Sequence, residues 1–369
     1  DQANPTIRHC KINNENKYGI YLTENSKGTI EYCDIFENLV SGIETRENSN
    51  PSVKRCNIFN NQQTGLFFTE NSQGTIENTN IYENNLSGVE LRKGSNPIFS
   101  ECQIYSNQRY GVLIDENSLG VIENTNIFSH KMPCIEIRDN SNPSLIGCRV
   151  YNSEDSGILI HKEAKGKIED CDIYSNNKSG ISISKGSSPI IRNSRFYDGK
   201  SSGITINKKS QATIEGCDIF RNSLFGIEIK ESNNIFISRC KVRNGRNVGI
   251  SISGKSEAQI ENCDIFKNVL TGIEIKGNST FNIRHSKIFN GKKSGIIFSE
   301  NSQGIVEDSD IFANTSIGIE IHDKSNPVIR KCRFFDGKDS GILIIKEGKG
   351  KVENCEIFCN YRAGIFITQ

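Results

Sequence analysis

The stretch IEDCDIYSN, residues 168 to 176, places three acidic side chains, Glu169, Asp170 and Asp172, within four positions. Paired carboxylates cleave glycosidic bonds, one acting as the acid and the other as a base or nucleophile. That chemistry requires the two carboxylates to face each other across one groove, with at least one pKa shifted by burial or by a like charge. Whether these acids meet those conditions depends on the elements that carry them.

Those elements come from a repeat of 23 residues. Starting at Asn4, sixteen units follow one another without insertion or deletion, and NPVIRKCRFFDGKDSGILIIKEG, residues 326 to 348, is typical. Each unit holds short β-type runs such as CDIF, has no apolar pattern of period 3.6, and is too short for a strand-helix-strand unit. The repeat therefore predicts an all-β fold, a right-handed parallel β-helix solenoid of about sixteen coils. Residues 1–369 are predicted to form a single β-helix repeat domain.

The acids of the opening stretch belong to a second period, of 46 residues. Glu169 and Asp172 recur two units later as Glu215 and Asp218, while Arg192 and Arg195 hold the same positions in the unit between. Alternating charges on neighbouring rungs attract each other, and a slip by one unit would place like charges together. We interpret these acids as outward rungs of a charge ladder.

Other catalytic arrangements are equally hard to assemble from the repeat. The five histidines lie in different units, and the repeat contains no Ser/His/Asp or Cys/His arrangement and no CxxC cluster. We therefore predict no catalytic residue, no cofactor and no metal site. The chain is more readily interpreted as a non-enzyme.

Eleven of the thirteen cysteines share position 7 of the unit, where stacked neighbours would have nearly parallel Cα–Cβ vectors. This pattern predicts buried free thiols, and hence an intracellular location in the cytoplasm or nucleus. The formal charge of +1 gives no attraction to nucleic acid or to a membrane surface. No apolar run approaches the ~20 residues that cross a bilayer.

The third strand of each unit carries a different pattern. Position 18 alternates between glutamate in six of the even units and mostly apolar residues in the odd units, and position 20 follows each of those glutamates with a base. This stripe predicts a rigid face that binds protein partners, or else residues that only cover the solenoid. The candidate partner-binding face consists of Tyr21, Glu44, Arg46, Phe67, Glu90, Arg92, Leu113, Glu136, Arg138 and Leu159.

The sixth unit departs from the repeat. His130-Lys131-Met132-Pro133-Cys134 replaces the usual Asn-x-x-x-Gly corner, and Cys134 is the one residue other than glycine at position 16. Two interpretations remain open, a local bulge used for recognition and a tolerated substitution.

The alternating NPxIR and GxxEN units of NPVIRKCRFFDGKDSGILIIKEGKGKVENCEIFCNYRAGIFI, residues 326 to 367, resemble the central repeats of the F-box-only protein family. Related repeats, described as carbohydrate-binding and sugar-hydrolase repeats, recur in many parallel β-helix proteins. The resemblance implies the substrate-recruiting region of a modular ubiquitin ligase. No unit has the Asp-Pro-His-Asp motif expected of alginate-epimerase-like β-helices, which argues against that branch.

The sequence thus predicts a non-catalytic intracellular scaffold that binds protein partners along one face. The alternative is a carbohydrate-binding or carbohydrate-cleaving β-helix. The second alternative is a structural rod or assembly unit that associates end to end.

Overall fold

The computed structural model describes residues 3–369, which form 48 short β-strands and no helix. Three strands make one turn of about 23 residues. The predicted fold, an all-β right-handed parallel solenoid of about sixteen turns, is confirmed. In these residues no helix is long and apolar enough to cross a membrane.

The strands fall into three sets, one from each side of the turn. The first strands are β1 (Thr6–Arg8), β4 (Lys27–Glu31), β7 (Asn50–Lys54), β10 (Thr75–Glu77), β13 (Ile98–Ser100), β16 (Val121–Glu123), β19 (Ser144–Ile146), β22 (Lys167–Glu169), β25 (Ile190–Arg192), β28 (Ala212–Glu215), β31 (Ile235–Ser238), β34 (Glu257–Glu261), β37 (Thr280–Arg284), β40 (Gln303–Glu307), β43 (Asn326–Arg330) and β46 (Lys351–Glu353). The second strands are β2 (Lys11–Asn13), β5 (Asp34–Phe36), β8 (Asn57–Phe59), β11 (Asn80–Tyr82), β14 (Gln103–Tyr105), β17 (Asn126–Phe128), β20 (Arg149–Tyr151), β23 (Asp172–Tyr174), β26 (Arg195–Tyr197), β29 (Asp218–Phe220), β32 (Lys241–Arg243), β35 (Asp264–Phe266), β38 (Lys287–Phe289), β41 (Asp310–Phe312), β44 (Arg333–Phe335) and β47 (Glu356–Phe358). The third strands are β3 (Ile20–Leu22), β6 (Ile43–Thr45), β9 (Leu66–Phe68), β12 (Val89–Leu91), β15 (Val112–Ile114), β18 (Ile135–Ile137), β21 (Ile158–Ile160), β24 (Ile181–Ile183), β27 (Ile204–Asn207), β30 (Ile227–Lys230), β33 (Ile250–Ser253), β36 (Ile273–Ile275), β39 (Ile296–Phe298), β42 (Ile319–Ile321), β45 (Ile342–Ile344) and β48 (Ile365–Ile367).

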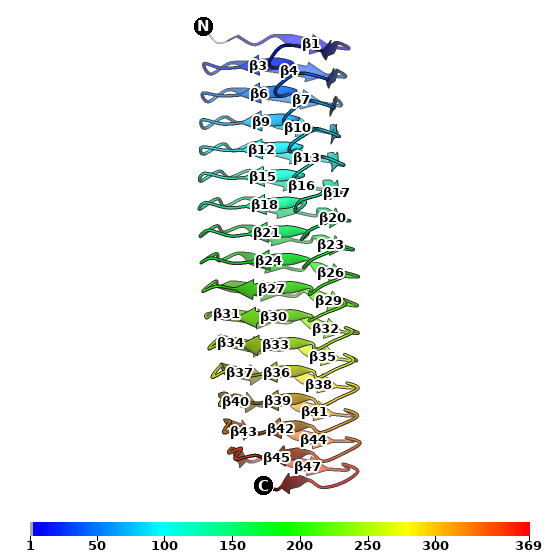
Figure 1. The fold of residues 1–369 in the computed structure, drawn as a ribbon, viewed down its shortest axis with the longest axis vertical. Coiled ribbons are helices and arrows are strands. Elements are labelled where there is room, and N and C mark those ends of the chain that lie inside the picture. Colours follow the sequence, from blue (N-terminus) through cyan, green and yellow to red (C-terminus); the bar gives the residue numbers. More distant parts are fainter. Residues whose placement is uncertain (1–2) are drawn as a thin grey trace. The chain divides into compact units, whose positions relative to one another are not determined.

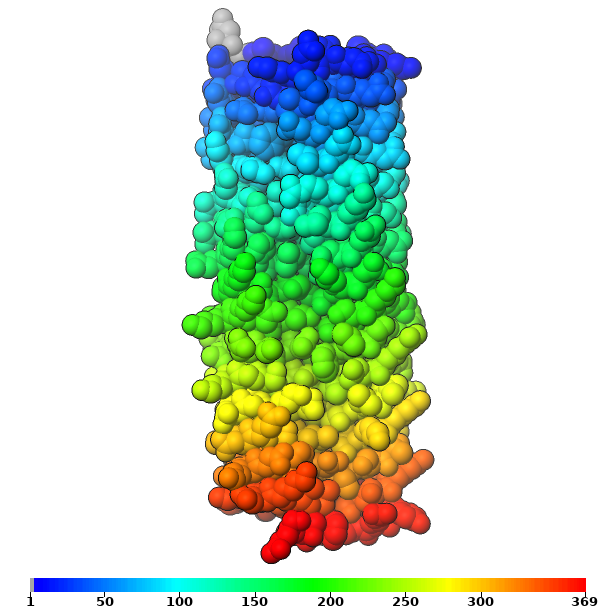
Figure 2. Space-filling view, in the orientation of Figure 1, coloured from blue at the N-terminus to red at the C-terminus, as the bar shows by residue number. Residues whose placement is uncertain are grey.

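The chain divides into two compact units, residues 1–182 with 187–190 and residues 183–186 with 191–369. Within each unit, the strands of one turn pair in parallel with those of the next (Figure 1). Each residue lies opposite the residue 23 positions further on, as Thr6 does with Thr29 in the first unit and Asp218 with Lys241 in the second. In the space-filling view, the turns of each unit follow one another as bands in sequence order (Figure 2).

The core of each unit is a column of residues that alternate along the strands. In the opening stretch Ile168, Cys171 and Ile173 are buried, whereas Glu169 and Asp172 are half-buried and lie on the outside. All thirteen cysteines are free thiols. A cysteine in the shared position donates its thiol to backbone carbonyls, as Cys171 does to Glu169 at 3.2 Å.

Asp170 occupies a corner between two strands. Its φ of 54° is left-handed, and the equivalent Tyr32, Asn78 and Gly216 have φ values of 54°, 51° and 66°. A residue at this corner belongs to neither flanking strand and must only tolerate the left-handed conformation. This explains why the position varies so much along the sequence.

Two side-chain ladders fix the register inside the first unit. The rings of Phe36 and Phe59 stack with centroids 4.9 Å apart and planes at 7°, and the stack continues through the next turns. Asn38 Nδ2 donates to Asn61 Oδ1 at 2.9 Å, and the next asparagine continues the ladder at the same distance. These buried amides also bond to backbone groups, as Asn61 Nδ2 does to the Ile35 carbonyl at 3.5 Å, and a slip in pairing would break both sets of bonds.

The alternating charges meet across neighbouring turns. Arg8 Nε lies 2.8 Å from Glu31 Oε2 in the first unit, and Arg333 Nη2 lies 2.6 Å from Asp310 Oδ2 in the second. In the sixth turn β18 keeps the common register with both neighbours, since Ile135 lies opposite Val112 and Ile158. The pairing of β18 therefore contains no bulge. Use of the corner from His130 to Cys134 for recognition stays a prediction.

Candidate functional site

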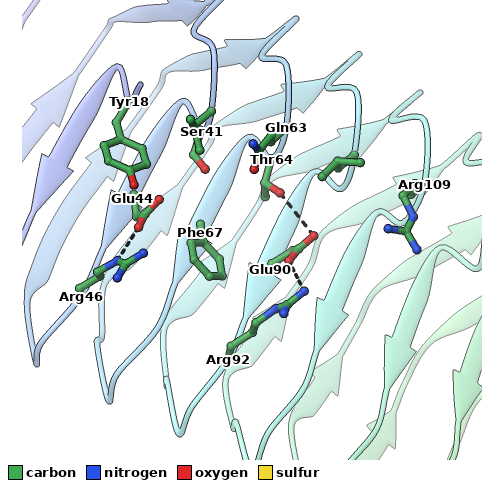
Figure 3. A pocket seen from close by; sticks show the side chains of 12 residues that line it. Tyr18, Ser41, Glu44, Arg46, Gln63, Thr64, Phe67, Glu90, Arg92 and Arg109 are labelled. Atoms are coloured by element: carbon green, nitrogen blue, oxygen red, sulfur yellow. Dashed lines mark hydrogen bonds and ion pairs between the residues drawn. The ribbon is translucent and has the colours of Figure 1, made fainter. Parts of the chain in front are cut away.

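A pocket of about 370 Å³ lies in the first unit, on the outer face of β6, β9 and β12 and the turns that precede them. Figure 3 shows that its lining comes from successive turns. The residues that line it are Tyr18, Val40, Ser41, Glu44, Arg46, Gln63, Thr64, Phe67, Leu86, Glu90, Arg92 and Arg109. Five of them, Glu44, Arg46, Phe67, Glu90 and Arg92, belong to the face predicted from the sequence.

Two carboxylates lie at the base of this pocket, each under an arginine from the same strand end. Arg46 Nε donates to Glu44 Oε1 at 2.5 Å, and Arg92 Nη2 donates to Glu90 Oε2 at 2.9 Å. Ser87 and Thr64 hydroxyls also donate to Glu90 Oε1, at 2.8 and 3.3 Å. The guanidinium groups remain partly exposed, so each pair presents cationic N–H groups outward and keeps its carboxylate inside.

Glu44 is only 1% exposed, and the cost of removing its carboxylate from water shows in its pKa. Burial raises the pKa of Glu44 above its usual value, and the hydrogen bond and charge of Arg46 oppose this rise without cancelling it. The Arg46 guanidinium therefore stabilises the ionised form of a carboxylate that the local burial disfavours.

Phe67 lies between the two ion pairs (Figure 3). It comes from β9, and its neighbours opposite on β6 and β12 are Glu44 and Glu90. The ring is half-buried, and the Arg92 guanidinium carbon lies 6.0 Å from its centroid. The pocket thus combines one apolar ring face with hydrogen-bonding groups on both sides.

Further along the same face, turns five to seven bring together Tyr110, Asp115, Glu136, Arg138 and His161. Arg138 Nη2 lies 2.6 Å from Asp115 Oδ2, and Arg138 Nη1 lies 3.0 Å from Glu136 Oε1. His161 Nε2 is 3.0 Å from the same Glu136 oxygen, and Tyr110 is also hydrogen-bonded to Glu136. This cluster is a compact network of titratable groups.

Glu136 occupies the same position of the repeat as Glu44, but its pKa shifts in the opposite direction. Burial opposes ionisation of Glu136, but hydrogen bonds with His161 and Tyr110 and the charges of His161 and Arg138 outweigh it and lower the pKa. Burial and the Glu136 charge raise the pKa of Tyr110. Glu136 is therefore held ionised at neutral pH, while Tyr110 keeps its proton.

The structure places all ten residues of the predicted face in the first compact unit, but their side chains differ in exposure to solvent. Tyr21 is 48% exposed, Phe67 and Leu159 are half-buried, and Leu113 is 2% exposed. Glu44, Glu90 and Glu136 point away from the core and are nevertheless buried, because side chains of adjoining positions and turns cover them. The simple alternation of inward and outward residues did not reveal this burial.

Sequence reasoning did not select Tyr18, Arg109 and Tyr110 for this face. They occupy positions 14 and 15 of the 23-residue repeat, in the loop that precedes the third strand. A search extended to that loop would have found them. Within residues 3–369, no three His, Cys, Asp or Glu side chains are grouped so that they could hold a metal ion.

The family model for the right handed beta helix region matches residues 1–96, 54–174, 87–233 and 225–369. The β-helix part of the resemblance found in the sequence is thus supported, whereas the F-box-only family in particular is not. No curated protein matches the sequence.

Solved structures share the fold at low sequence identity. The periplasmic alginate epimerase AlgG has a TM-score of 0.50 and 14% identity, with 91% of this chain and 78% of that chain covered. The catalytic domain of Agl-KA has a TM-score of 0.49 and 11% identity, covering 78% and 62%. The A-module of mannuronan C-5 epimerase AlgE6 from Azotobacter vinelandii has a TM-score of 0.42 and 11% identity, covering 94% and 91%. At 14% identity, the likeness to AlgG shows the fold alone.

These comparisons correct two predictions. The protein-binding scaffold of an F-box-type ubiquitin ligase is wrong as the main interpretation, because the structure that matches with a TM-score of 0.50 is an alginate epimerase, which favours the carbohydrate alternative. The intracellular location is also contradicted, since a structure that shares this fold is a periplasmic protein. The physical reason is that thiols packed in the core and hydrogen-bonded to backbone carbonyls can stay out of disulfides without a reducing compartment, so their pattern does not fix the location.

Proposed function

Because this chain belongs to the family of right-handed β-helix proteins, we propose that it binds carbohydrate on the outer face of β6, β9 and β12. The observation that carries the proposal is the half-buried ring of Phe67 between the Glu44–Arg46 and Glu90–Arg92 pairs. A carbohydrate ligand is also what the name of the alginate epimerase AlgG gives for a protein of this fold.

The pocket suits the mixed chemistry of a sugar. One face of a pyranose ring exposes C–H groups, which pack on an aromatic ring, while its hydroxyls need both donors and acceptors at the rim. Phe67 offers the ring, Arg46 and Arg92 offer planar sets of N–H donors, and the Thr64 and Gln63 side chains offer further polar groups. The sheet beneath is rigid, which lowers the entropy cost of ordering the site.

A panel of immobilised polysaccharides tests the proposal. The wild-type chain should bind at least one of them, and Phe67→Ala should weaken that binding about tenfold, because the loss of a ring contact costs roughly 1.4 kcal/mol. Tyr32→Ala is the matched control, since Tyr32 is an exposed aromatic of the same unit outside the pocket. Equal loss of binding in both variants, or no binding by the wild type, would contradict the proposed function.

Carbohydrate cleavage is a second candidate, and the contact of Glu136 with Tyr110 and His161 favours it. A histidine beside an ionised carboxylate can transfer protons to or from a bound ligand. The test is release of new chain ends from a polysaccharide that the protein binds. His161→Gln should abolish the release and leave binding unchanged. Release that persists in this variant would exclude the cluster as its source.

A further inference from the structure

We infer that the ligand of this face is an uncharged polysaccharide and not an anionic one such as a polyuronate. The inference rests on the proposed carbohydrate function and adds to it the chemical class of the ligand. The charges on and around the face argue against an acidic polymer, and the spacing of its aromatic rings fits a linear chain.

Three arginines of the face are already neutralised, whereas Arg109, which also lines the pocket, is exposed and lies over Tyr110, with its guanidinium carbon 5.3 Å from the ring centroid. Arg46 and Arg92 are each paired with the glutamate of their own turn, and Arg138 contacts both Asp115 and Glu136. An anionic ligand would compete with buried carboxylates that cannot move into water, and breaking such a pair leaves an uncompensated buried charge. Neutral hydroxyls, in contrast, can use the outward N–H groups without displacing the carboxylates.

The turn that follows the third strand adds negative charge beside the face. The residue in question is position 21 of the 23-residue repeat. In turns one to seven it is an acid five times and a base twice. The acids are Glu24, Glu47, Glu70, Glu116 and Asp139, and the bases are Lys93 and Lys162. Both bases are paired with acids: Lys93 Nζ lies 3.4 Å from Glu70 Oε1, and Lys162 Nζ lies 3.2 Å from Asp139 Oδ2. A polyanion lying along the strands' outer face would therefore approach a surface of its own sign.

The apolar groups recur at a spacing that suits a linear glycan. Tyr21 and Phe67 are equivalent residues two turns apart, so their strands are about 10 Å apart at the usual spacing of parallel strands. That separation is close to the length of one disaccharide in an extended β-linked chain. Tyr18 stacks on Tyr21 with ring centroids 5.0 Å apart and widens the platform at its first position. A chain that crosses β3, β6 and β9 would thus place two alternate sugars on the rings of Tyr21 and Phe67.

The experiment measures binding of the full chain to matched neutral and acidic polymers. The neutral probes are cellulose, xylan, mannan and galactan oligosaccharides, and the acidic probes are mannuronate and galacturonate oligosaccharides of equal length. We expect at least one neutral probe to bind more than tenfold tighter than either acidic probe. That affinity should change less than twofold between low salt and about 1 M salt, where the Debye length is about 3 Å.

A charge variant separates this inference from a general failure to bind. Glu47→Gln with Glu116→Gln removes two turn acids that do not line the pocket. It should leave neutral-probe affinity within twofold and raise acidic-probe affinity at low salt. Tighter binding of an acidic probe by the wild type, weakened by salt, would overturn the inference while the proposed function stands. Absence of binding to every probe would overturn both.

Discussion

At the scale of single residues, His130 links stability to pH, although its side chain is buried and only 1% exposed to solvent. It replaces asparagine in the buried ladder of the sixth turn. Its Nδ1 accepts the Asn107 N–H at 3.2 Å, and its Nε2 lies 3.1 Å from the Ile104 carbonyl, to which the neutral ring donates. Burial lowers the pKa of His130 to about 4, despite these hydrogen bonds.

Because the unfolded chain binds this proton at a pKa of about 6.5, protonation favours unfolding between the two values. The contribution is complete above pH 6.5 and is lost as the pH falls towards 4, by about 3 kcal/mol in total. His130→Asn should remove this part of the pH dependence, since an amide can make both hydrogen bonds and does not titrate. Urea unfolding at pH 7 and pH 5 measures it; equal pH dependence in both proteins would contradict the assignment.

At the scale of one element and its neighbour, the sixth turn shows how the repeat tolerates an exception. At the equivalent Gly111, an added Cβ would lie 2.6 Å from both Ile127 Cγ2 and His130 Nε2 of the next turn. The turn after Cys134 carries Ser153 where most turns carry the larger asparagine, so the amide that would crowd the added carbon is absent there. Cys134 is fully buried there and its thiol donates to the Tyr151 carbonyl at 3.7 Å, while the Ser153 hydroxyl donates to the Met132 carbonyl at 2.9 Å.

We therefore expect Cys134 and Ser153 to be energetically coupled. Ser153→Asn alone should destabilise the protein by about 1–3 kcal/mol through overpacking against the thiol. In a Cys134→Gly background the same substitution should cost much less, because it restores the usual pair of glycine and asparagine. Denaturant unfolding of the wild type, both single variants and the double variant gives the coupling energy. Strictly additive effects would show that the two positions do not share this space.

The same elements show what the sequence can and cannot reveal. Positions such as those of Cys171 and Ile173 were predictable as interior, because each turn must fill the same slot and strand alternation fixes its direction. The burial of Glu44 was not predictable. Alternation correctly directs this side chain outward, but it does not show that adjoining side chains bury it. Tyr110 was overlooked because it precedes a strand and meets Glu136 only across turns.

At the scale of the whole molecule, the period of 46 residues should decide which deletions of whole turns keep the charge ladder intact. Arg330 Nη2 lies 2.8 Å from Glu307 Oε2, and Arg284 approaches the same carboxylate from the other side at 3.4 Å. Deleting one turn, residues 280–302, would bring Glu261 opposite Glu307 and Asp264 opposite Asp310. Deleting two turns, residues 280–325, would instead bring the two acids opposite Arg330 and Arg333.

Both deletions preserve the 23-residue frame and the interior slots, so they differ chiefly in charge. Each like-charged pair costs about 0.2–1 kcal/mol, and the attraction it replaces is lost as well. The one-turn deletion should therefore be the less stable at low salt, by about 1–2 kcal/mol, although it keeps more of the chain. It should recover most of this difference at about 1 M salt, where screening is strong. Thermal unfolding of the two variants at both salt concentrations measures the effect; a one-turn deletion that is the more stable at low salt would show that the charge ladder does not govern stacking.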